Sequence, residues 1–295
     1  MKYSIVETNV IHHGDCRQIL PTLPEQSVDL IVTSPPYADR RKNSYGGVAP
    51  ECYVDWFLPI SAELYRVLKP EGSFILNIKE RVVNGERGTY VMELVLEMRK
   101  QGWLWTEDYC WHKKNSYPGK WPNRFRDGWE HCFHFTKQKK FKMYQDAVMV
   151  PIGEWAEKRL THLTKNDHVR DESRVGSGFG KRVVNWIGRD LVYPNNVLHL
   201  ATEVSNKAHS AVFPIELPMW FIRLFTKTGD VVLDPFLGSG TAARAAVRLN
   251  RKYIGIELLP EYIDLARKNL EAEQPHLFEK PISYGKKARQ GNKFG

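Results

Sequence analysis

Hydrophobic positions in the first 112 residues follow two alternating spacings. Short apolar runs predict strands at 10–13, 28–32, 73–78 and from Trp103 onward. Apolar residues three or four positions apart predict helices at 53–68 and 90–99. The first helix is followed by a turn sequence, Lys69-Pro70-Glu71-Gly72. Strands and helices therefore alternate, which indicates a parallel sheet covered by helices.

The same alternation returns after Ala201. Helices are predicted at 215–225, 241–249 and 262–270, and strands at 230–234 and 253–257. Between 113 and 200 the pattern is irregular, although 129–136 reads as a strand. We therefore expect an α/β fold in four parts: 1–112, 113–200, 201–274 and a basic tail over 275–295.

The net charge of +9 is concentrated in the middle of the chain. The stretch 111–190 holds 17 lysines and arginines against 9 acidic residues, and tryptophans lie at 103, 105, 111, 121 and 129. Basic residues interleaved with aromatics suit a polyanion whose bases can stack on protein rings. The alternative is a solvated loop region whose lysines maintain solubility.

Other features of the composition describe an ordinary globular protein. No apolar run is long enough to span a bilayer, and the N-terminus lacks the apolar stretch of a signal peptide. Four cysteines are scattered without a CxxC pair, which fits reduced thiols. A cytoplasmic protein with no membrane partner is therefore expected.

One candidate ligand loop, Asp234-Pro235-Phe236-Leu237-Gly238-Ser239-Gly240-Thr241, connects a predicted strand to a predicted helix. Its glycines let the backbone approach a ligand, and the helix start offers N–H groups. The next strand ends at Glu257, from which a carboxylate can bind both hydroxyls of a ribose. The loop has no phosphate-binding lysine, and Asp234 would repel a phosphate, so S-adenosylmethionine fits better than a dinucleotide or ATP. The alternative is a tight connection without a ligand.

A second loop, Thr33-Ser34-Pro35-Pro36-Tyr37, follows another predicted strand at the same ligand-bearing edge. Its prolines fix the backbone and hold Ser34 and Tyr37 at the end of the strand. Ser34 Oγ and the Pro35 carbonyl can accept hydrogen bonds from an exocyclic amine, and the Tyr37 ring can stack on a base flipped out of a duplex. The alternative is a rigid turn, which leaves unexplained an exposed tyrosine beside a charged run.

Two further patterns have ordinary structural explanations. The glycine-rich run at 176–180 has no strand leading into it, so a turn is favoured over a phosphate loop. Zinc-type ligands also occur, at Cys110, His112, His131, Cys132 and His134. Alternation along the strand at 129–136 points neighbouring side chains to opposite faces, which favours strand histidines over a metal site. No metal is therefore expected.

The motifs and their order resemble the amino-specific DNA methyltransferases of the permuted beta group, found in restriction–modification systems. In that group the catalytic loop comes early, a target-recognition region follows and the cofactor loop comes late. Here the Ser-Pro-Pro-Tyr loop precedes the glycine loop by about two hundred residues. Further matches are Gly14-Asp15-Cys16, the leucine-rich segment 64–72 and the segment 207–214.

The resemblance covers roughly residues 10–112 and 200–272, and it implies a fold and its parts. The fold would be the Rossmann-like fold of S-adenosylmethionine-dependent methyltransferases in circularly permuted order. Residues 1–112 would form its catalytic half, 113–200 an inserted target-recognition region, and 201–274 the cofactor-binding half.

The resemblance also implies roles for individual residues. The target amine would be held by Ser34, Pro35, Pro36 and Tyr37. The cofactor would be bound by Asp15, Asp234, Phe236, Gly238, Ser239, Gly240, Thr241 and Glu257. Separately from the resemblance, the basic stretches predict contacts with double-stranded DNA at Arg41, Lys113, Lys114, Arg124 and Arg126. For these cations, surface solvation is the alternative.

The resemblance favours one target base. A serine at the head of the catalytic loop is typical of cytosine-N4 enzymes, whereas aspartate or asparagine is usual in adenine-N6 enzymes. We therefore expect site-specific methylation of cytosine N4, with adenine N6 as the alternative. The sequence has no Pro-Cys dipeptide, the nucleophile motif of cytosine-C5 enzymes. An RNA or protein methyltransferase and an inactive DNA-binding module are the other hypotheses.

The resemblance bears on partners as well. Enzymes of this architecture often form homodimers, and many accompany a cognate restriction endonuclease. The sequence identifies neither a dimer interface nor a recognition sequence.

Overall fold

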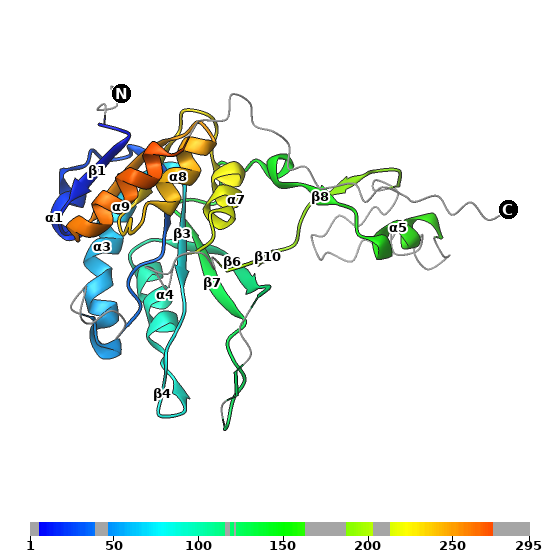
Figure 1. Cartoon of the computed structure of the whole chain (residues 1–295), viewed down its shortest axis with the longest axis horizontal. Coiled ribbons are helices and arrows are strands. Elements are labelled where there is room, and N and C mark those ends of the chain that lie inside the picture. The colour runs from blue at the N-terminus through cyan, green and yellow to red at the C-terminus, as the bar shows by residue number, and fades with distance from the viewer. Residues whose placement is uncertain are drawn as a thin grey trace. The chain divides into compact units, whose positions relative to one another are not determined.

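A mostly parallel sheet of eight strands forms the centre of the larger of two units into which the chain divides (Figure 1). The computed structural model describes residues 6–38, 47–115, 119–120, 122–162, 187–202 and 213–273. The larger unit is Met1–Tyr144 with Asn195–Glu279, and the smaller is Gln145–Pro194 with Lys280–Gly295. Four sequence predictions fall wholly or largely outside the described residues: Arg41, the glycine run at 176–180, the segment 207–214 and the tail at 275–295.

The elements of the larger unit match the alternation seen in the sequence. The strands lie in the order β1 (Val10–His13), β12 (Lys252–Glu257), β11 (Val231–Asp234), β2 (Val28–Thr33), β3 (Leu68–Ile78), β7 (Trp129–Thr136), β6 (Leu104–Lys113) and β10 (Val197–Leu200). The α-helices are α1 (Cys16–Ile19), α3 (Tyr53–Val67), α4 (Tyr90–Lys100), α7 (Glu216–Phe225), α8 (Thr241–Arg248) and α9 (Pro260–Glu271). Short 3-10 helices are η1 (Leu20–Thr22) and η2 (Pro50–Cys52), and β4 (Val82–Val83) pairs with β5 (Glu86–Arg87) in a hairpin.

The described part of the smaller unit has little regular structure. It contains η3 (Gln145–Val148), α5 (Glu154–Thr161) and a short antiparallel pair, β8 (Val150–Pro151) with β9 (Leu191–Val192). The Tyr193 hydroxyl donates to Asp146 Oδ1 at 2.9 Å, which joins the two ends of the segment Gln145–Pro194.

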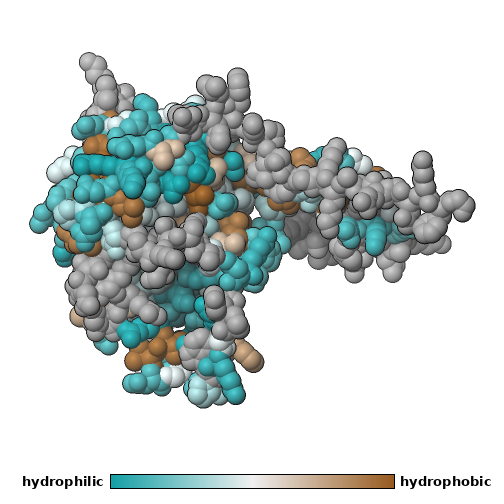
Figure 2. All heavy atoms as spheres, viewed as in Figure 1, coloured by the Kyte–Doolittle hydropathy of each residue, from teal (hydrophilic) through white to brown (hydrophobic). Residues whose placement is uncertain are grey.

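The described surface that faces the viewer in Figure 2 is mainly polar. Hydrophilic residues cover most of the described surface in the view of Figure 2, and hydrophobic residues occur there in small groups. Across the described segments, no helix is long and apolar enough to cross a membrane.

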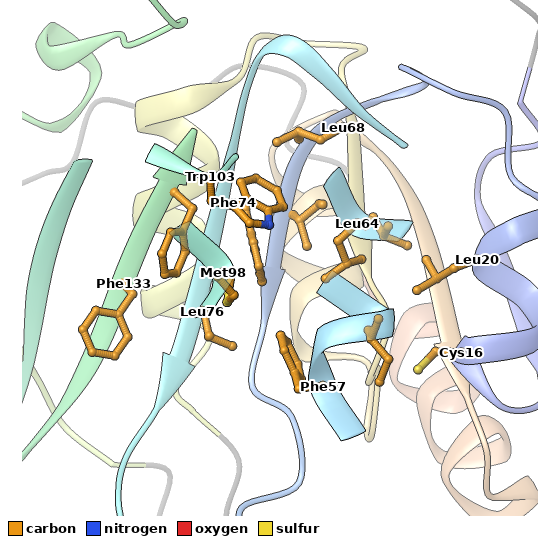
Figure 3. Packing of buried hydrophobic residues seen from close by; sticks show 14 of the residues in the cluster. Cys16, Leu20, Phe57, Leu64, Leu68, Phe74, Leu76, Met98, Trp103 and Phe133 are labelled. Atoms are coloured by element: carbon orange, nitrogen blue, oxygen red, sulfur yellow. The ribbon is translucent and has the colours of Figure 1, made fainter. Parts of the chain in front are cut away.

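Alternate residues of the strands face opposite layers of helices. On one face, Ile31, Phe74 and Phe133 belong to a buried cluster that includes residues of α3 and α4 (Figure 3). On the other face, the His134 ring packs against Phe225 of α7, with 4.5 Å between centroids. A parallel sheet needs helices on both sides because both of its faces are apolar. The arrangement confirms the predicted α/β fold with helices on both faces.

Helix α3 shows how the hydrophobic pattern produces this packing. Its buried residues recur every three or four positions: Tyr53, Phe57, Ile60, Ser61, Leu64 and Val67. The turn predicted after it, at 69–72, is instead the first part of β3, where the register against β2 shifts between Val28 and Leu30. Lys69 donates there to the buried carboxylate of Asp29 at 2.7 Å, and the prediction of an open turn was wrong.

The stretch 113–200 is partly built into the sheet. Strand β7 lies antiparallel between β3 and β6, and β10 pairs with β6 in parallel. These strands belong to the larger unit, so the units divide the chain at 144 and 195, whereas the sequence suggested divisions at 112 and 200.

Topology places one crevice where ligands are expected. The seven mutually parallel strands end at a single edge of the sheet, and the antiparallel β7 begins at that edge. From β2 the chain passes through α3 to β3, and from β11 it passes through α8 to β12 in the opposite direction along the sheet. The neighbouring ends of β2 and β11 therefore form a topological switch point, the usual ligand crevice of an open α/β sheet.

Candidate active site

The two candidate loops meet at this switch point. Thr33 ends β2 and Asp234 ends β11, and both side chains are buried. Thr33 Oγ donates a hydrogen bond to Asp234 Oδ1 at 2.6 Å, across 201 positions of sequence. The Ser-Pro-Pro-Tyr loop and the glycine loop thus start from adjacent, hydrogen-bonded residues.

Asp234 is a buried acid held by neutral donors. Its Oδ1 accepts from Thr33 and also from the Phe236 backbone N–H at 3.0 Å. Burial and, to a smaller extent, the charge of Glu257 raise the pKa of Asp234 to about 7, although the two hydrogen bonds act in the opposite direction. A cationic ligand would stabilise this carboxylate in its charged form.

Phe236, two residues further along the same loop, packs against α3. Its ring is 5.8 Å from that of Trp56 and 6.4 Å from that of Phe57, measured between centroids. These contacts anchor the start of the glycine loop to the core.

The glycine loop folds around the carboxylate of Glu257. Its Oε2 accepts from the Gly238 N–H at 2.7 Å, and its Oε1 accepts from the Leu259 N–H at 2.9 Å. Gly240 precedes α8 with a φ of 86°, and a Cβ there would lie 3.0 Å from the Cβ of Ala266. Both the left-handed conformation and the close approach require glycine at this position.

Ser239 and Thr241 are also buried in the loop. The Ser239 carbonyl accepts from Asn269 Nδ2 at 2.9 Å, and Thr241 begins α8. Their side chains therefore lie at the start of a helix, as the sequence predicted.

Asp15 lies at the end of the neighbouring strand β1. The adjacent Gly14 N–H donates to the Glu257 carbonyl at 2.9 Å, so Asp15 and Glu257 lie at the ends of neighbouring strands. Asp15 caps α1 by accepting from the Arg17 N–H at 2.9 Å, and the Arg17 guanidinium also contacts it. Hydrogen bonding to Arg17 lowers the pKa of Asp15 below its ordinary value.

The groups along this part of the edge fit S-adenosylmethionine. A buried carboxylate bonded by neutral donors suits a positive charge, and a second carboxylate inside a glycine loop suits ribose hydroxyls. The loop sequence offers no lysine for a phosphate.

The Ser-Pro-Pro-Tyr loop is rigid and partly buried. Pro35 is buried, and the Pro36 carbonyl accepts from the hydroxyl of Tyr53, itself fully buried, at 2.9 Å. Ser34 Oγ lies 3.4 Å from the Tyr37 hydroxyl. Tyr37 is half-buried, so the expectation of an exposed tyrosine was wrong.

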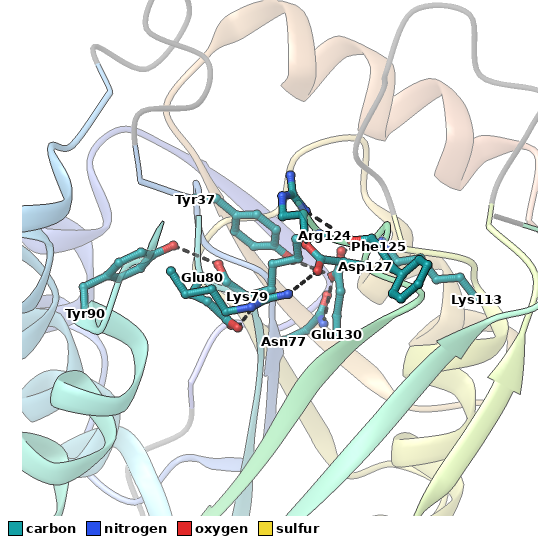
Figure 4. Close-up of polar contacts among 11 residues, drawn as sticks. Tyr37, Asn77, Lys79, Glu80, Tyr90, Lys113, Arg124, Phe125, Asp127 and Glu130 are labelled. Carbon is teal, nitrogen blue, oxygen red and sulfur yellow. Dashed lines mark hydrogen bonds and ion pairs between the residues drawn. The ribbon is translucent and has the colours of Figure 1, made fainter. Parts of the chain in front are cut away.

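The Tyr37 hydroxyl contacts a residue that the sequence did not single out. It donates to Glu130 Oε2 at 2.7 Å, and burial together with the charge of Glu130 raises the pKa of Tyr37 well above its ordinary value. Glu130 also accepts from Lys113 Nζ at 2.6 Å and from Asn77 Nδ2 at 3.3 Å (Figure 4). An acidic residue within the apolar strand 129–136 was the available signal, but its partners come from three distant segments.

Four of the five predicted DNA contacts lie at the same edge of the sheet. Lys113 ends β6, Lys114 follows it, and Arg124 and Arg126 precede β7. Lys114 and Arg126 are exposed, whereas Lys113 is paired with Glu130.

A cluster of ion pairs joins the loop before β7 to the hairpin β4–β5. Asp127 contacts Lys79 at 3.1 Å, Arg124 at 3.9 Å and the guanidinium of Arg87. Burial alone would raise the pKa of Asp127, but Arg87 and Lys79 lower it below its ordinary value. Between Arg124 and Arg126, the ring of Phe125 is 95% exposed.

Two of the histidines considered for zinc have other contacts. His131 Nδ1 lies 2.9 Å from Asp108 Oδ2, His134 Nε2 lies 3.0 Å from Ser73 Oγ, and the His131 and Phe133 rings stack on one face. Among the described residues, no group of three potential ligands is placed to hold a metal.

The fold and the site define an S-adenosylmethionine-dependent methyltransferase. Comparison with protein-family models narrows the class: the DNA methylase family N6_N4_Mtase matches residues 28–268. The chain belongs to this family, which modifies amino groups of DNA bases, as the motif order predicted.

Individual relatives agree with this assignment. The type II methyltransferase M.PvuII of Proteus hauseri is 31% identical over 271 residues, covering 85% of this chain and 80% of the relative. The DNA adenine methyltransferase YhdJ of Escherichia coli strain K12 is 28% identical, covering 97% and 90%. A relative named for adenine therefore stands beside one of the PvuII type.

Solved structures show the same fold. The PvuII DNA methyltransferase, described as cytosine-N4-specific, has a TM-score of 0.66 and 27% identity, covering 92% of this chain and 96% of that one. A DNA modification methylase from Thermus thermophilus, TTHA0409, complexed with S-adenosyl-L-methionine, has a TM-score of 0.59 and 27% identity, covering 90% and 94%.

Proposed function

We propose that this enzyme methylates the N4 amino group of cytosine at a specific site in double-stranded DNA. The observation that carries the proposal is Ser34, a neutral hydroxyl at the head of a proline-fixed loop beside the cofactor crevice. The likeness to the cytosine-N4-specific PvuII enzyme supports the same base.

The chemistry requires acceptors that hold the target amine. The lone pair of an exocyclic amine is delocalised into the ring of the base, so the nitrogen is a poor nucleophile. Ser34 Oγ and the Pro35 carbonyl accept its two N–H groups, which draws the nitrogen toward tetrahedral geometry and directs its lone pair outward. The Tyr37 ring packs against the flipped base. Positioning of this kind supplies much of the rate.

Residues on the other side of the crevice hold the cofactor, which when bound supplies an activated methyl group. Asp234 faces its positive charge, Glu257 binds the ribose and Asp15 lies near the adenine. Phe236, Gly238, Ser239, Gly240 and Thr241 line the remaining surface.

The middle of the chain recognises DNA in this proposal. Residues 113–200 form the target-recognition region, and the cations at its start bind phosphates or bases. Lys113, Lys114, Arg124 and Arg126 lie at the edge of the sheet that carries both loops. A cognate restriction endonuclease and a homodimer are the partners that this assignment implies.

The test is to methylate mixed-sequence duplex DNA with labelled cofactor and to identify the product by nucleoside mass spectrometry. N4-methylcytosine is the expected product. N6-methyladenine would retain the mechanism and replace the base, and label in RNA alone would overturn DNA as the substrate.

A further inference from the structure

A buried carboxylate lies directly behind the Ser-Pro-Pro-Tyr loop. Glu130, at the start of β7, is 6% exposed and receives hydrogen bonds from three separate segments (Figure 4). Tyr37 and Asn77 donate to its Oε2 at 2.7 and 3.3 Å, and Lys113 donates to its Oε1 at 2.6 Å. A buried carboxylate requires such compensation, and Lys113 supplies the opposite charge.

The charge of Glu130 fixes the direction of a chain of hydrogen bonds. An ionised carboxylate only accepts, so the Tyr37 hydroxyl proton points toward Glu130. The Tyr37 oxygen is then the acceptor for Ser34 Oγ–H, 3.4 Å away. Because the Ser34 proton points toward Tyr37, the lone pairs of Ser34 Oγ are directed elsewhere.

This direction matters for the transfer of a methyl group to an amine. A serine that donated its proton to the amine would occupy the nitrogen lone pair, which has to attack the methyl carbon. A serine that accepts an N–H from the amine leaves that lone pair available. The orientation of one hydroxyl therefore separates a productive from an unproductive contact.

We propose that Glu130 is a positioning residue that sets the direction of the Ser34–Tyr37 chain and thereby holds Ser34 as an acceptor. The inference rests on the proposed role of Ser34 in binding the target amine, and it applies to cytosine and to adenine alike. Glu130 acts through Tyr37 and touches neither the base nor the cofactor.

The first test replaces the charge and keeps the shape. Glu130→Gln retains an acceptor oxygen but adds a donor, which allows the chain to reverse. Under single-turnover conditions with saturating DNA and cofactor, the transfer rate should fall about 10- to 100-fold. In a separate steady-state titration, the KM for DNA should change by less than about twofold. Glu130→Asp, which keeps the charge, should recover part of the rate.

A matched control comes from another buried carboxylate. Asp29 is 2% exposed and pairs with Lys69 at 2.7 Å and Lys142 at 3.3 Å. It lies in β2, away from both loops. Asp29→Asn should lower the unfolding midpoint and leave the transfer rate unchanged. If it slows transfer as much as Glu130→Gln does, general loss of a buried ion pair explains the effect and the proposal is overturned.

A double-mutant cycle tests the route through Tyr37. Tyr37→Phe removes the Tyr37 hydroxyl and with it the hydrogen bonds from Ser34 to Glu130. Adding Glu130→Gln should therefore slow transfer by less than about twofold further. Independent, multiplying losses would overturn the proposal. So would a Glu130→Gln enzyme with the wild-type rate, and the proposed function would then still stand.

The hydrogen bond itself has a readout that needs no substrate. Both substitutions act on the same hydrogen bond, between Tyr37 and residue 130, so their effects on the thermal unfolding midpoint should be non-additive. Additive shifts would overturn the inference whether or not the protein is active. A wild-type protein that methylates neither DNA nor RNA would instead overturn the proposed function.

Discussion

Burial of Asp234 makes the stability of the folded protein depend on pH. The Asp234→Asn variant tests this dependence. The side chain is 3% exposed, and burial raises its pKa from 3.8 to about 7. Both donors, Thr33 Oγ–H and the Phe236 N–H, bond the same oxygen, Oδ1. An asparagine can present its carbonyl oxygen at that position and keep both hydrogen bonds.

The sign and size of the effect follow from proton linkage. The unfolded carboxyl loses its proton near pH 3.8, whereas the folded one keeps it up to about pH 7. The contribution of the Asp234 carboxyl to the free energy of unfolding is therefore fully present below pH 3.8 and is lost as the pH rises through about 7. A shift of this size corresponds to about 4 kcal/mol. Since asparagine does not titrate, the variant should gain up to that much over the wild type above pH 7.

The assay is thermal unfolding of both proteins without cofactor from pH 5 to pH 8. The difference in midpoint should grow with pH and level off above about pH 7. A difference that stays constant over this range would refute the burial argument for Asp234. In calorimetry at pH 8 the variant should also bind S-adenosylmethionine at least about 10-fold more weakly, because it lacks the charge. Equal affinity would show that Asp234 does not face the cation.

Three other substitutions test different parts of the site. Ser34→Ala should lower the methylation rate at least about 10-fold with cofactor affinity unchanged, since it removes one acceptor for the amine; a wild-type rate would contradict the role of Ser34. Gly240→Ala should destabilise the protein by about 1–3 kcal/mol in denaturant unfolding and weaken cofactor binding, because its φ of 86° and the 3.0 Å approach to Ala266 exclude a methyl group; unchanged stability would contradict this. Lys114→Glu should weaken DNA binding and reduce its salt slope by about 1, as measured by fluorescence anisotropy; unchanged binding would contradict its placement at the DNA.

The local pattern was sufficient to predict most of the sheet and the loops at its edge. Strand β2 is buried along its whole length, and a continuous apolar run in the sequence predicted it. The two loops that follow β2 and β11 were recognisable because prolines and glycines interrupt regular structure where ligands bind. Parallel strands end at the same edge, so sequence alone also predicted that the loops lie together.

The local sequence pattern could not predict which distant segments contact one another. The sequence of β7 alternates in the same way whether its neighbours run parallel or antiparallel, so its reversed direction could not be predicted. The hydrogen bond between Thr33 and Asp234 joins residues 201 positions apart. Glu130 is an ordinary acidic residue until Tyr37 and Lys113 are brought to it by folding.

Three buried carboxylates along one edge have different hydrogen-bond partners, which suits each of them to a different role in the proposed function. Asp234 is bonded by neutral donors and its pKa is raised, so it is suited to a cation that restores its charge. Glu257 accepts from the backbone N–H groups of Gly238 and Leu259, and a carboxylate beside a glycine loop suits hydroxyl donors. Glu130 is paired with Lys113 through one carboxylate oxygen and accepts a hydrogen bond from Tyr37 through the other. The ligand group that each carboxylate suits therefore depends on the hydrogen-bond donors that the fold places beside it.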